Sequence, residues 1–219
     1  MENFYITVAG PIGVGKTTVA ELLGEELNCR ILYETVENHP HLNSFYDSMA
    51  EFEAMPKKIL SKIETELTIS KCLYYSALTQ IHFLFDRFWK HLAARASGSS
   101  IGDRSIYEDE IFARLLVEEG KMEKIFFFET YLPHFTILTG LLRPPDTMII
   151  LQASTDVLME RIDKRSRGME QKIPKNYIKK LNSAYNKWEG SYSTRHKTIT
   201  IETDTLTPKE IIQLIISKL

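Results

Sequence analysis

The chain has 219 residues, 43% of them apolar, and a formal net charge of −2 at pH 7, which suits one α/β domain over residues 1–219. Positive and negative charges are mixed along it, so no basic face favours a nucleic-acid polymer and small-molecule partners are expected. No apolar run approaches the ~20 residues of a membrane span, no leader is evident, and Cys29 and Cys72 form no metal motif, so we expect a cytoplasmic protein without a membrane partner.

Short apolar runs alternate with longer segments of helical periodicity, which is typical of a parallel sheet linked by crossover helices. Strands are predicted at residues 5–9, 30–33, 100–102, 148–152 and 198–201. Helices are predicted at residues 16–27, along a long segment ending near Ala96, and at residues 108–118, 121–142, 155–164, 175–192 and 208–219. Because ligands of such sheets bind at the carboxyl ends of the strands, the polar residues that follow each strand are the candidate site residues.

The first strand runs into GPIGVGKTT, which has the Gly-x-x-x-x-Gly-Lys-Thr spacing of a phosphate-binding loop. Glycine accepts the positive φ values of such a loop, and the following helix directs the positive end of its dipole at the anion. Lys16 would reach the β- and γ-phosphates, and the Thr17 hydroxyl would bind Mg²⁺. The candidate nucleotide-binding residues of this segment are Gly10, Gly13, Gly15, Lys16, Thr17 and Thr18.

The second strand is followed by Glu34, which is expected at the rim of the sheet beside the phosphate loop. A hydroxyl that is phosphorylated must lose a proton, and a carboxylate at this place can accept it. Position alone leaves a solvated loop acid equally open.

The third strand ends in Asp103 and Arg104. An acid at this position can organise Mg²⁺ in a phosphate-loop protein, and the adjacent guanidinium can bind a carboxylate or a phosphate in bidentate fashion. Asp109 faces the same rim if Glu108 opens the next helix. The alternative is an ordinary salt bridge at the end of the strand.

A cluster of arginines follows the fourth strand. Arg161 and Arg165 lie four residues apart and share a helix face, and Arg167 follows where Gly168 lets the chain leave the helix. Such guanidiniums can form a mobile lid, at about residues 161–173, that neutralises the charge of a transferring phosphoryl group. A solvated basic helix end explains the same residues equally well.

The long helix carries Gln80 and Arg87 on one face, two turns apart. A glutamine amide offers a donor and an acceptor side by side, which matches the edge of a base such as adenine. The apolar and aromatic residues between them, Phe83 and Leu84, are more typical of a core than of a base-stacking surface.

Five segments together resemble the deoxyribonucleoside kinase family, in particular its bacterial-type deoxyadenosine/deoxyguanosine kinase branch. In family order, over residues 6–174, they are GPIGVGKTT, YETVENHPHLNSFYD, QIHFLFDRF, DRSIYED and ERIDKRSRGMEQKIP. The resemblance implies a P-loop kinase with a five-stranded parallel sheet flanked by helices and an Arg-rich lid. The implied reaction, in nucleotide salvage, is Mg²⁺-dependent transfer of the γ-phosphate of ATP to the 5′-hydroxyl of a deoxyribonucleoside.

The resemblance also implies roles for single residues. Lys16, Glu34 and Arg104 form the catalytic set, in which Glu34 is the general base and Arg104 positions it and the phosphate. Tyr46 and Glu170 would bind the sugar 3′-hydroxyl. The arginines of the cluster described above would form the lid over ATP.

Gln80 would read the base, and an Arg87–Asp109 pair would occupy the far side of the base pocket, as in members that accept purines or deoxycytidine. We therefore expect deoxyadenosine, deoxyguanosine or deoxycytidine to be preferred and thymidine to be poor. A homodimer is expected from the resemblance and from the apolar segment IFFFETYLPHFTILTGLL at residues 125–142, which exceeds what one helix face can bury.

Two other functions compete with this interpretation. A thymidylate-type nucleoside monophosphate kinase shares the phosphate loop and the arginine cluster, but it needs basic groups for the acceptor phosphate where this chain carries Glu34, Glu37 and Asn38. A non-kinase nucleotide switch would leave Glu34 and Gln80 without a purpose, and the chain has no Asn-Lys-x-Asp segment for guanine.

Overall fold

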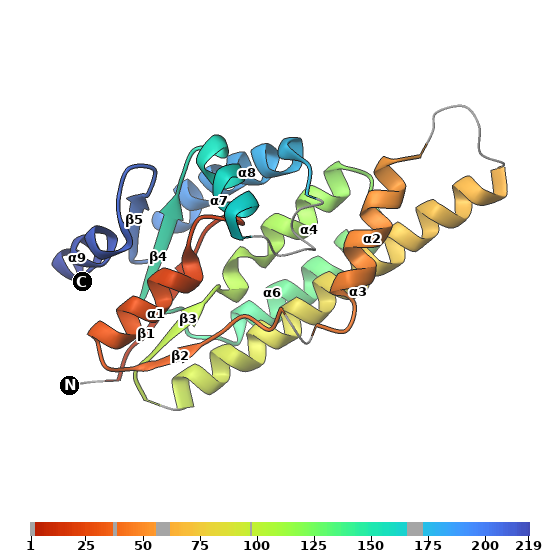
Figure 1. Cartoon of the computed structure of the whole chain (residues 1–219). Helices are drawn as coiled ribbons and strands as arrows, with labels where there is room; N and C mark the ends of the chain where they lie inside the picture. The colour runs from red at the N-terminus through yellow and green to blue at the C-terminus, as the bar shows by residue number, and fades with distance from the viewer. Residues whose placement is uncertain (1–2, 37–38, 56–61, 97, 166–172) are drawn as a thin grey trace.

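The computed structural model describes residues 3–36, 39–55, 62–96, 98–165 and 173–219. Its centre is a five-stranded, all-parallel sheet of order β2-β3-β1-β4-β5, which confirms the predicted fold class (Figure 1). The strands are β1 (Tyr5–Ala9), β2 (Arg30–Leu32), β3 (Ser100–Asp103), β4 (Thr147–Gln152) and β5 (Thr198–Glu202). Every residue of β1 is buried, as expected for a central strand covered on both faces.

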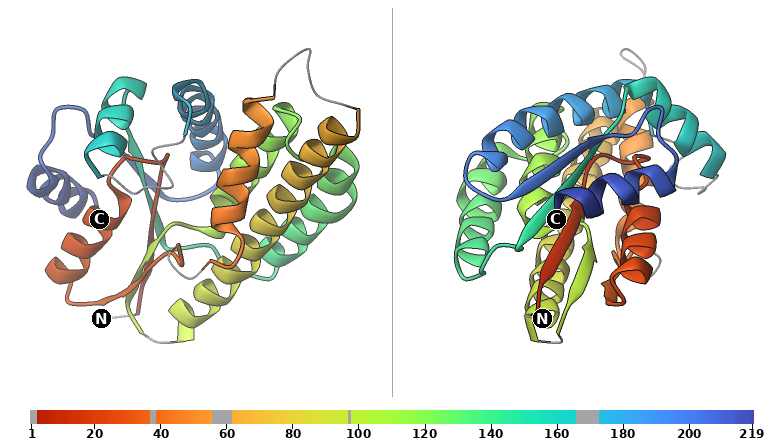
Figure 2. Two further views of the ribbon diagram at one scale, coloured as in Figure 1. Left: turned by 45° about the vertical axis from the view of Figure 1, so that its right-hand side comes forward. Right: turned by 90° about the vertical axis from the view of Figure 1, so that its left-hand side faces the viewer.

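Helices cover both faces of the sheet (Figure 2). One face carries α1 (Lys16–Glu26) and α9 (Pro208–Lys218), which pack against each other. The other face carries α3 (Lys62–Ala96), α4 (Asp109–Glu118) and α8 (Lys175–Ser193), with α7 (Thr155–Arg165) packed on α8. The last helix begins as its sequence predicts, because Thr207 and Glu210 form a reciprocal capping box in front of Pro208.

A helix that the sequence did not predict, α2 (Leu42–Glu53), packs along α3 (Figure 1). Its buried residues Leu42, Phe45 and Met49 repeat at helical spacing and form the face toward the core. No side chain caps its first turn, so the usual sequence signal for a helix start is missing. This helix carries Tyr46, one of the candidate site residues.

The helix predicted at residues 121–142 is shorter and is not regular. It starts only at Lys124 and runs through α5 (Lys124–Phe126), the π-helical turn η2 (Phe127–Tyr131) and α6 (Leu132–Gly140). Lys121 does not join this helix, because its backbone N–H donates to the Leu116 carbonyl at the end of α4 and its side chain pairs with Glu53 and Glu119. Pro133 has no N–H to continue the α-helical ladder, so the ladder changes register around it.

The register of the sheet decides which residues meet at the rim. Val8 of β1 pairs with Asp103 of β3, so the segment after β1 and the polar residues after β3 leave the sheet side by side. β2 ends at Leu32, one residue earlier than predicted, and Glu34 therefore lies in the connecting segment rather than in the strand. Among the described helices, none is both long enough and apolar enough to cross a bilayer.

Candidate active site

The loop between β1 and α1 has a backbone that only glycine accepts without strain. Gly10, Gly13 and Gly15 have φ values of 144°, 85° and 100°. Two of them are also closely packed, since a Cβ on Gly10 would lie 2.6 Å from the Leu151 carbonyl oxygen and one on Gly13 would lie 2.8 Å from that of Leu158. The loop is therefore packed closely against β4 and α7.

A cavity of about 690 Å³ lies beside this loop, large enough for a nucleotide. Its floor is the loop itself, including Gly13, Gly15 and the first turn of α1 with Lys16, Thr17 and Thr18. The rest of the wall is contributed by Tyr33, Glu34, Thr35, Val36, Asp103, Arg104, Arg161, Arg165, Leu206, Pro208 and Ile211. Most of the candidate nucleotide-binding residues thus converge on one space, but Gly10 does not line it, because its amide donates to the buried Glu108.

Lys16 lies in the wall of this cavity and is buried. Its ammonium donates one hydrogen bond to the Pro11 carbonyl, 2.8 Å away, which fixes the side chain across the loop. Burial and the neighbouring Arg104 guanidinium lower the pKa of Lys16 to about 8, against the opposing effect of nearby carboxylates. A bound phosphate would favour the charged form of this ammonium.

Thr17 and Asp103 both line this cavity and are hydrogen-bonded to each other. The Thr17 hydroxyl donates to Oδ2 of Asp103 over 2.6 Å, whereas Oδ1 of Asp103 is buried with no hydrogen-bond partner among the described residues. Burial raises the pKa of Asp103, and the Lys16 ammonium opposes that rise. A hydroxyl and a carboxylate oxygen without a partner are hard donors of the kind that Mg²⁺ prefers, so these two residues fit a magnesium site.

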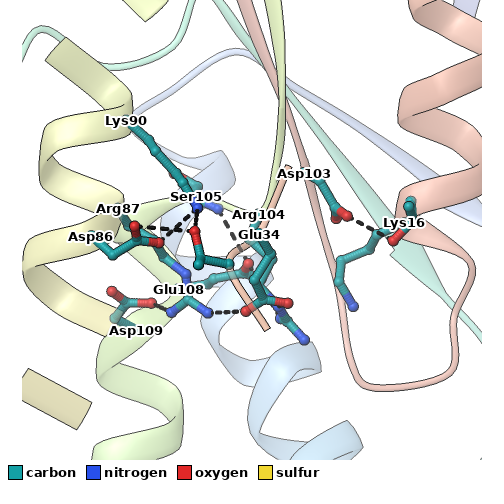
Figure 3. Close-up of polar contacts among 12 residues, drawn as sticks. Lys16, Glu34, Asp86, Arg87, Lys90, Asp103, Arg104, Ser105, Glu108 and Asp109 are labelled. Carbon is teal, nitrogen blue, oxygen red and sulfur yellow. Dashed lines mark hydrogen bonds and ion pairs between the residues drawn. The ribbon is translucent and has the colours of Figure 1, made fainter. Parts of the chain in front are cut away.

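Glu34 is held between two arginines from different elements (Figure 3). Nε of Arg104, just after β3, donates to Oε2 of Glu34 over 2.8 Å, and Nη2 of Arg87 on α3 contacts Oε1. Burial alone would raise the pKa of Glu34, but the two guanidiniums outweigh burial and lower it to about 2. The carboxylate is therefore ionised, oriented and placed at the edge of the phosphate cavity.

Arg87 uses its other terminal nitrogen to contact Asp109, which is almost completely buried at the start of α4 (Figure 3). The predicted Arg87–Asp109 contact is therefore present, and it forms one chain with Glu34. The guanidinium also lies over the Phe83 ring, 4.7 Å from its centre. Oδ2 of Asp109 and Nε of Arg87 are buried without a partner among the described residues.

A second, smaller cavity of about 50 Å³ lies between α2, α3, α4 and α8. Tyr46 and Gln80 both line it, together with Phe112 of α4 and Tyr177 of α8. Two of the predicted substrate-binding residues are thus brought together from separate helices, beside aromatic side chains suited to a base. Arg87 and Asp109 lie deeper and do not line this cavity.

The arginine cluster is only partly described by the structure. Arg161 donates to the Val14 carbonyl over 3.3 Å and to the hydroxyl and carbonyl of Thr203 over 2.9 and 2.7 Å. Its guanidinium therefore lies between the phosphate loop and the segment after β5. Arg165 lines the large cavity, and Arg167, Glu170, Glu37 and Asn38 lie outside the described residues.

Two buried site residues were missed at the level of sequence. Glu108 accepts hydrogen bonds from the Gly10 amide and from the Tyr185 hydroxyl, and Tyr185 also contacts Arg104. The spacing of Ser105 and Glu108 is that of a capping box, which is a sequence signal, but it points to a helix start rather than to a site. Tyr185 lies 77 residues further along the chain and carries no local signal at all.

Together, the parallel sheet, the glycine loop with its lysine, and the acid–arginine pair at the rim define a P-loop kinase. The family model "Deoxynucleoside kinase" matches residues 6–218, and the chain belongs to this family. It is an ATP-dependent kinase that phosphorylates deoxynucleosides.

Curated relatives and solved structures agree with this assignment. The chain is 31% identical to the deoxyadenosine/deoxycytidine kinase of Bacillus subtilis over 88% of its own length and 79% of that protein. It is 32% identical to the deoxyguanosine kinase of the same organism, over 83% and 76% of the two chains. A structure of deoxyadenosine kinase from M. mycoides with bound dATP has the same fold, with a TM-score of 0.77 and 24% identity over 98% of both chains.

Proposed function

We propose that the chain transfers the γ-phosphate of ATP to the 5′-hydroxyl of deoxyadenosine, deoxyguanosine or deoxycytidine, in nucleotide salvage. The observation that carries the 5′-hydroxyl assignment is the Glu34 carboxylate, which two arginines fix at the edge of the phosphate cavity. A carboxylate placed there binds an uncharged hydroxyl acceptor, whereas an acceptor that already carried a phosphate would be repelled. The same residue therefore disfavours the thymidylate-type alternative.

In this proposal Glu34 takes the proton of the 5′-hydroxyl while that oxygen bonds to the γ-phosphorus and ADP leaves. A carboxylate whose pKa is about 2 is a weak base. The proton therefore moves to it late, once the hydroxyl oxygen has begun to bond to phosphorus and has become acidic. Arg104 holds the base and neutralises phosphoryl charge, and Lys16 stabilises the β- and γ-phosphates.

Thr17 and Asp103 would hold Mg²⁺, with the unpartnered Asp103 oxygen as the acidic contact. A bound Mg²⁺ supplies positive charge that the transferring phosphoryl group needs. Arg165 and Arg167 would contribute further positive charge from the segment at residues 161–173, and Gly13 and Gly15, which line the large cavity, would bind ATP through their amides.

The nucleoside would occupy the small cavity, enlarged to fit it. Gln80 would bind the base edge, Tyr46 with Glu170 the 3′-hydroxyl, and Arg87 with Asp109 the far side of the base. The bulky Arg87–Asp109 pair would leave little room for a thymine methyl. A base that left a donor or an acceptor of this buried pair without a hydrogen bond would bind more weakly by ~1–3 kcal/mol. The names of the Bacillus relatives support deoxyadenosine, deoxycytidine and deoxyguanosine as the group of substrates.

The test is a comparison of kcat/KM for the four deoxynucleosides and their monophosphates with Mg·ATP. We expect turnover of the purine nucleosides and deoxycytidine, at least tenfold poorer turnover of thymidine, and none of the monophosphates. A folded Lys16→Ala variant should be inactive and serves as the control for a contaminating kinase. Turnover of a monophosphate would overturn the proposed acceptor, and a preference for thymidine would overturn only the base assignment.

The functional form is proposed to be a homodimer that joins the α3–α6 faces of two copies. Large apolar side chains are exposed on these two helices, including Phe85 and Trp89 on α3, Ile137 on α6 and Leu141 just after α6. The two helices contact each other and lie side by side in Figures 1 and 2, and in this proposal a two-fold axis buries their exposed apolar side chains against those of a second copy.

Sedimentation velocity at micromolar concentration checks the dimer. We expect a dimer for the parent chain, a monomer for Trp89→Glu, and a dimer for Leu214→Glu, which places the same charge at an exposed leucine of α9. A monomeric parent chain would refute the proposal.

A further inference from the structure

A buried carboxylate connects the phosphate loop to the arginine that holds the base. Glu108 is completely buried and lies at the end of the short 3₁₀ turn η1 (Ile106–Glu108). Its Oε2 accepts from the Gly10 amide over 3.1 Å and from the Tyr185 hydroxyl over 2.7 Å. Its Oε1 accepts from the Ser105 amide over 3.2 Å and lies 3.5 Å from Nη1 of Arg104.

Tyr185 on α8 completes this arrangement from the opposite side. Its ring is buried, its hydroxyl donates to Glu108, and the same oxygen accepts from Nη1 of Arg104 over 3.2 Å. The two residues therefore surround one terminal nitrogen of Arg104. Glu108 and Tyr185 are 77 positions apart in the sequence, and neither lines the large nucleotide cavity.

Arg104 needs such support because its backbone is in an unfavourable conformation. Its φ of 78° lies in the left-handed region that residues other than glycine rarely adopt, and strain of this kind persists only where the surroundings enforce it. Its side chain is placed by three groups of contacts: Nε on Glu34, Nη1 on Gly10, Glu108 and Tyr185, and the guanidinium 5.2 Å from the centre of the Phe112 ring. Nη2 takes part in none of these hydrogen bonds.

We propose that Glu108 and Tyr185 are positioning residues for phosphoryl transfer: they lock Nη1 of Arg104 to the first glycine of the phosphate loop and so aim Nη2 at the transferring phosphate. This inference rests on the proposed roles of Arg104 and Glu34. Because Glu108 binds the Gly10 amide and Arg104 at once, it sets the distance between the ATP site and the base. Small displacements of such groups are costly in rate.

Helix capping alone does not account for Glu108. The cap uses only Oε1 and the Ser105 amide, whereas Oε2 points away from the turn to Gly10 and Tyr185. A residue needed only for the cap would have no reason to bind the phosphate loop. The two functions are separable, since removal of the Tyr185 hydroxyl leaves the cap intact.

The experiment compares Tyr185→Phe with a matched control, Tyr192→Phe. Tyr192 is a buried tyrosine of the same helix whose hydroxyl has no hydrogen-bond partner among the described residues. We expect Tyr185→Phe to lower kcat about tenfold with each KM changed less than threefold, and Tyr192→Phe to leave kcat within twofold. Equal kcat for both variants, or a loss seen only in KM, would overturn the proposal.

A double-mutant cycle shows whether Tyr185 acts through Arg104. Arg104→Lys removes the planar fork, so it should lower kcat strongly, and adding Tyr185→Phe should then lower kcat less than twofold further. Additive losses would mean that Tyr185 acts independently and would contradict the inference. If Arg104→Lys itself keeps full activity, the proposed function of Arg104 is wrong, which is a different outcome from a silent Tyr185→Phe. Glu108→Gln should reproduce the loss in kcat if it folds, and the conclusion does not depend on it.

Discussion

At the scale of single residues, the central feature is a carboxylate that is ionised although it is largely buried. Two guanidiniums keep the pKa of Glu34 near 2, so its charge does not change over the pH range of catalysis. The low pKa makes Glu34 a poor base in the resting enzyme, and the orientation imposed by Arg104 and Arg87 compensates by placing it in one geometry.

We predict that Glu34→Gln lowers kcat by ~10²-fold or more with little change in either KM, because an amide keeps the size but cannot accept the proton. Steady-state kinetics with saturating Mg·ATP measures both constants. Glu26→Gln, at the exposed end of α1, is the control and should behave as the parent chain. A large rise in the nucleoside KM with unchanged kcat would show that Glu34 binds substrate and does not act as the base.

Many of the site residues that were predicted from the sequence lie at or just after the ends of strands, whereas Tyr185, which was missed, does not. The loop glycines and Lys16 come after the buried strand β1, and Asp103 is the last residue of β3, so the rule that ligands bind at strand ends finds them. Tyr185 contributes through a contact from the middle of a helix, where neither hydrophobic period nor spacing distinguishes it from an ordinary core tyrosine. Arg161 lines the large cavity, but its hydrogen-bond partner Thr203 lies beyond β5 and has no recognisable motif.

At the scale of elements, α3 is the helix on which the nucleoside half of the site depends. It carries Gln80 to the small cavity and Arg87 to Glu34. Asp86 and Lys90, on either side of Arg87 in the sequence, both contact Thr35 in the segment that bears Glu34. The same helix therefore positions Gln80, the proposed base-binding residue, and holds the segment that bears Glu34, the proposed catalytic carboxylate.

We predict that Asp109→Asn, where α4 meets α3, reduces discrimination against thymidine by about tenfold or more. The substitution keeps the shape but removes the charge that fixes Arg87. The measurement is the ratio of kcat/KM for deoxyadenosine and thymidine, taken with the thermal midpoint because the buried Arg87 loses one of its two carboxylate partners, which also destabilises the fold. Glu110→Gln, the adjacent acid that pairs with Arg114, is the control. An unchanged ratio would mean that the pair is a packing interaction outside the base pocket.

Elements with local signals were predicted well, and elements without them were not. Alternating strands and helices follow from apolar runs, and the capping box at Thr207 marks the start of α9. In contrast, α2 has no capping side chain. Pro133 marks an interruption of the helix before α6, but the apolar pattern of Phe127–Tyr131 does not distinguish a π-helical turn from a regular helix. The long-range arrangement of the small cavity, built from four helices, is likewise a property of the folded chain.

At the scale of the whole molecule, buried histidines make the fold sensitive to acid. His91 is buried against the edge of Tyr5, and its Nε2 lies 2.8 Å from the Arg143 carbonyl oxygen. Burial lowers the pKa of His91 to about 4, against the opposing effect of that hydrogen bond. Because the folded pKa is below the unfolded value near 6.5, the associated stability is complete above pH 6.5 and is lost as the pH falls toward 4.

We therefore predict that the free energy of unfolding falls by about 2 kcal/mol more between pH 7 and pH 4.5 in the parent chain than in His91→Gln. Urea titrations at a series of pH values give this difference, even though the variant is less stable at pH 7. His134→Gln, at an exposed histidine of α6, should show the parent slope. Parallel slopes for all three proteins would exclude His91 as a source of acid sensitivity.

The central place of β1 has a consequence for biosynthesis. This strand is synthesised before its two neighbours, which begin at Ser100 and Thr147, so both of its edges and its largely apolar side chains lack partners until those strands appear. At ~5–20 residues per second, the wait for β4 lasts roughly 7–30 s. During this interval the nascent chain presents an unpaired, apolar strand of the kind that associates with other chains. The strand order that brings the phosphate loop beside Asp103 thus also leaves the central strand of the nascent chain without partners until the middle of the sheet can close.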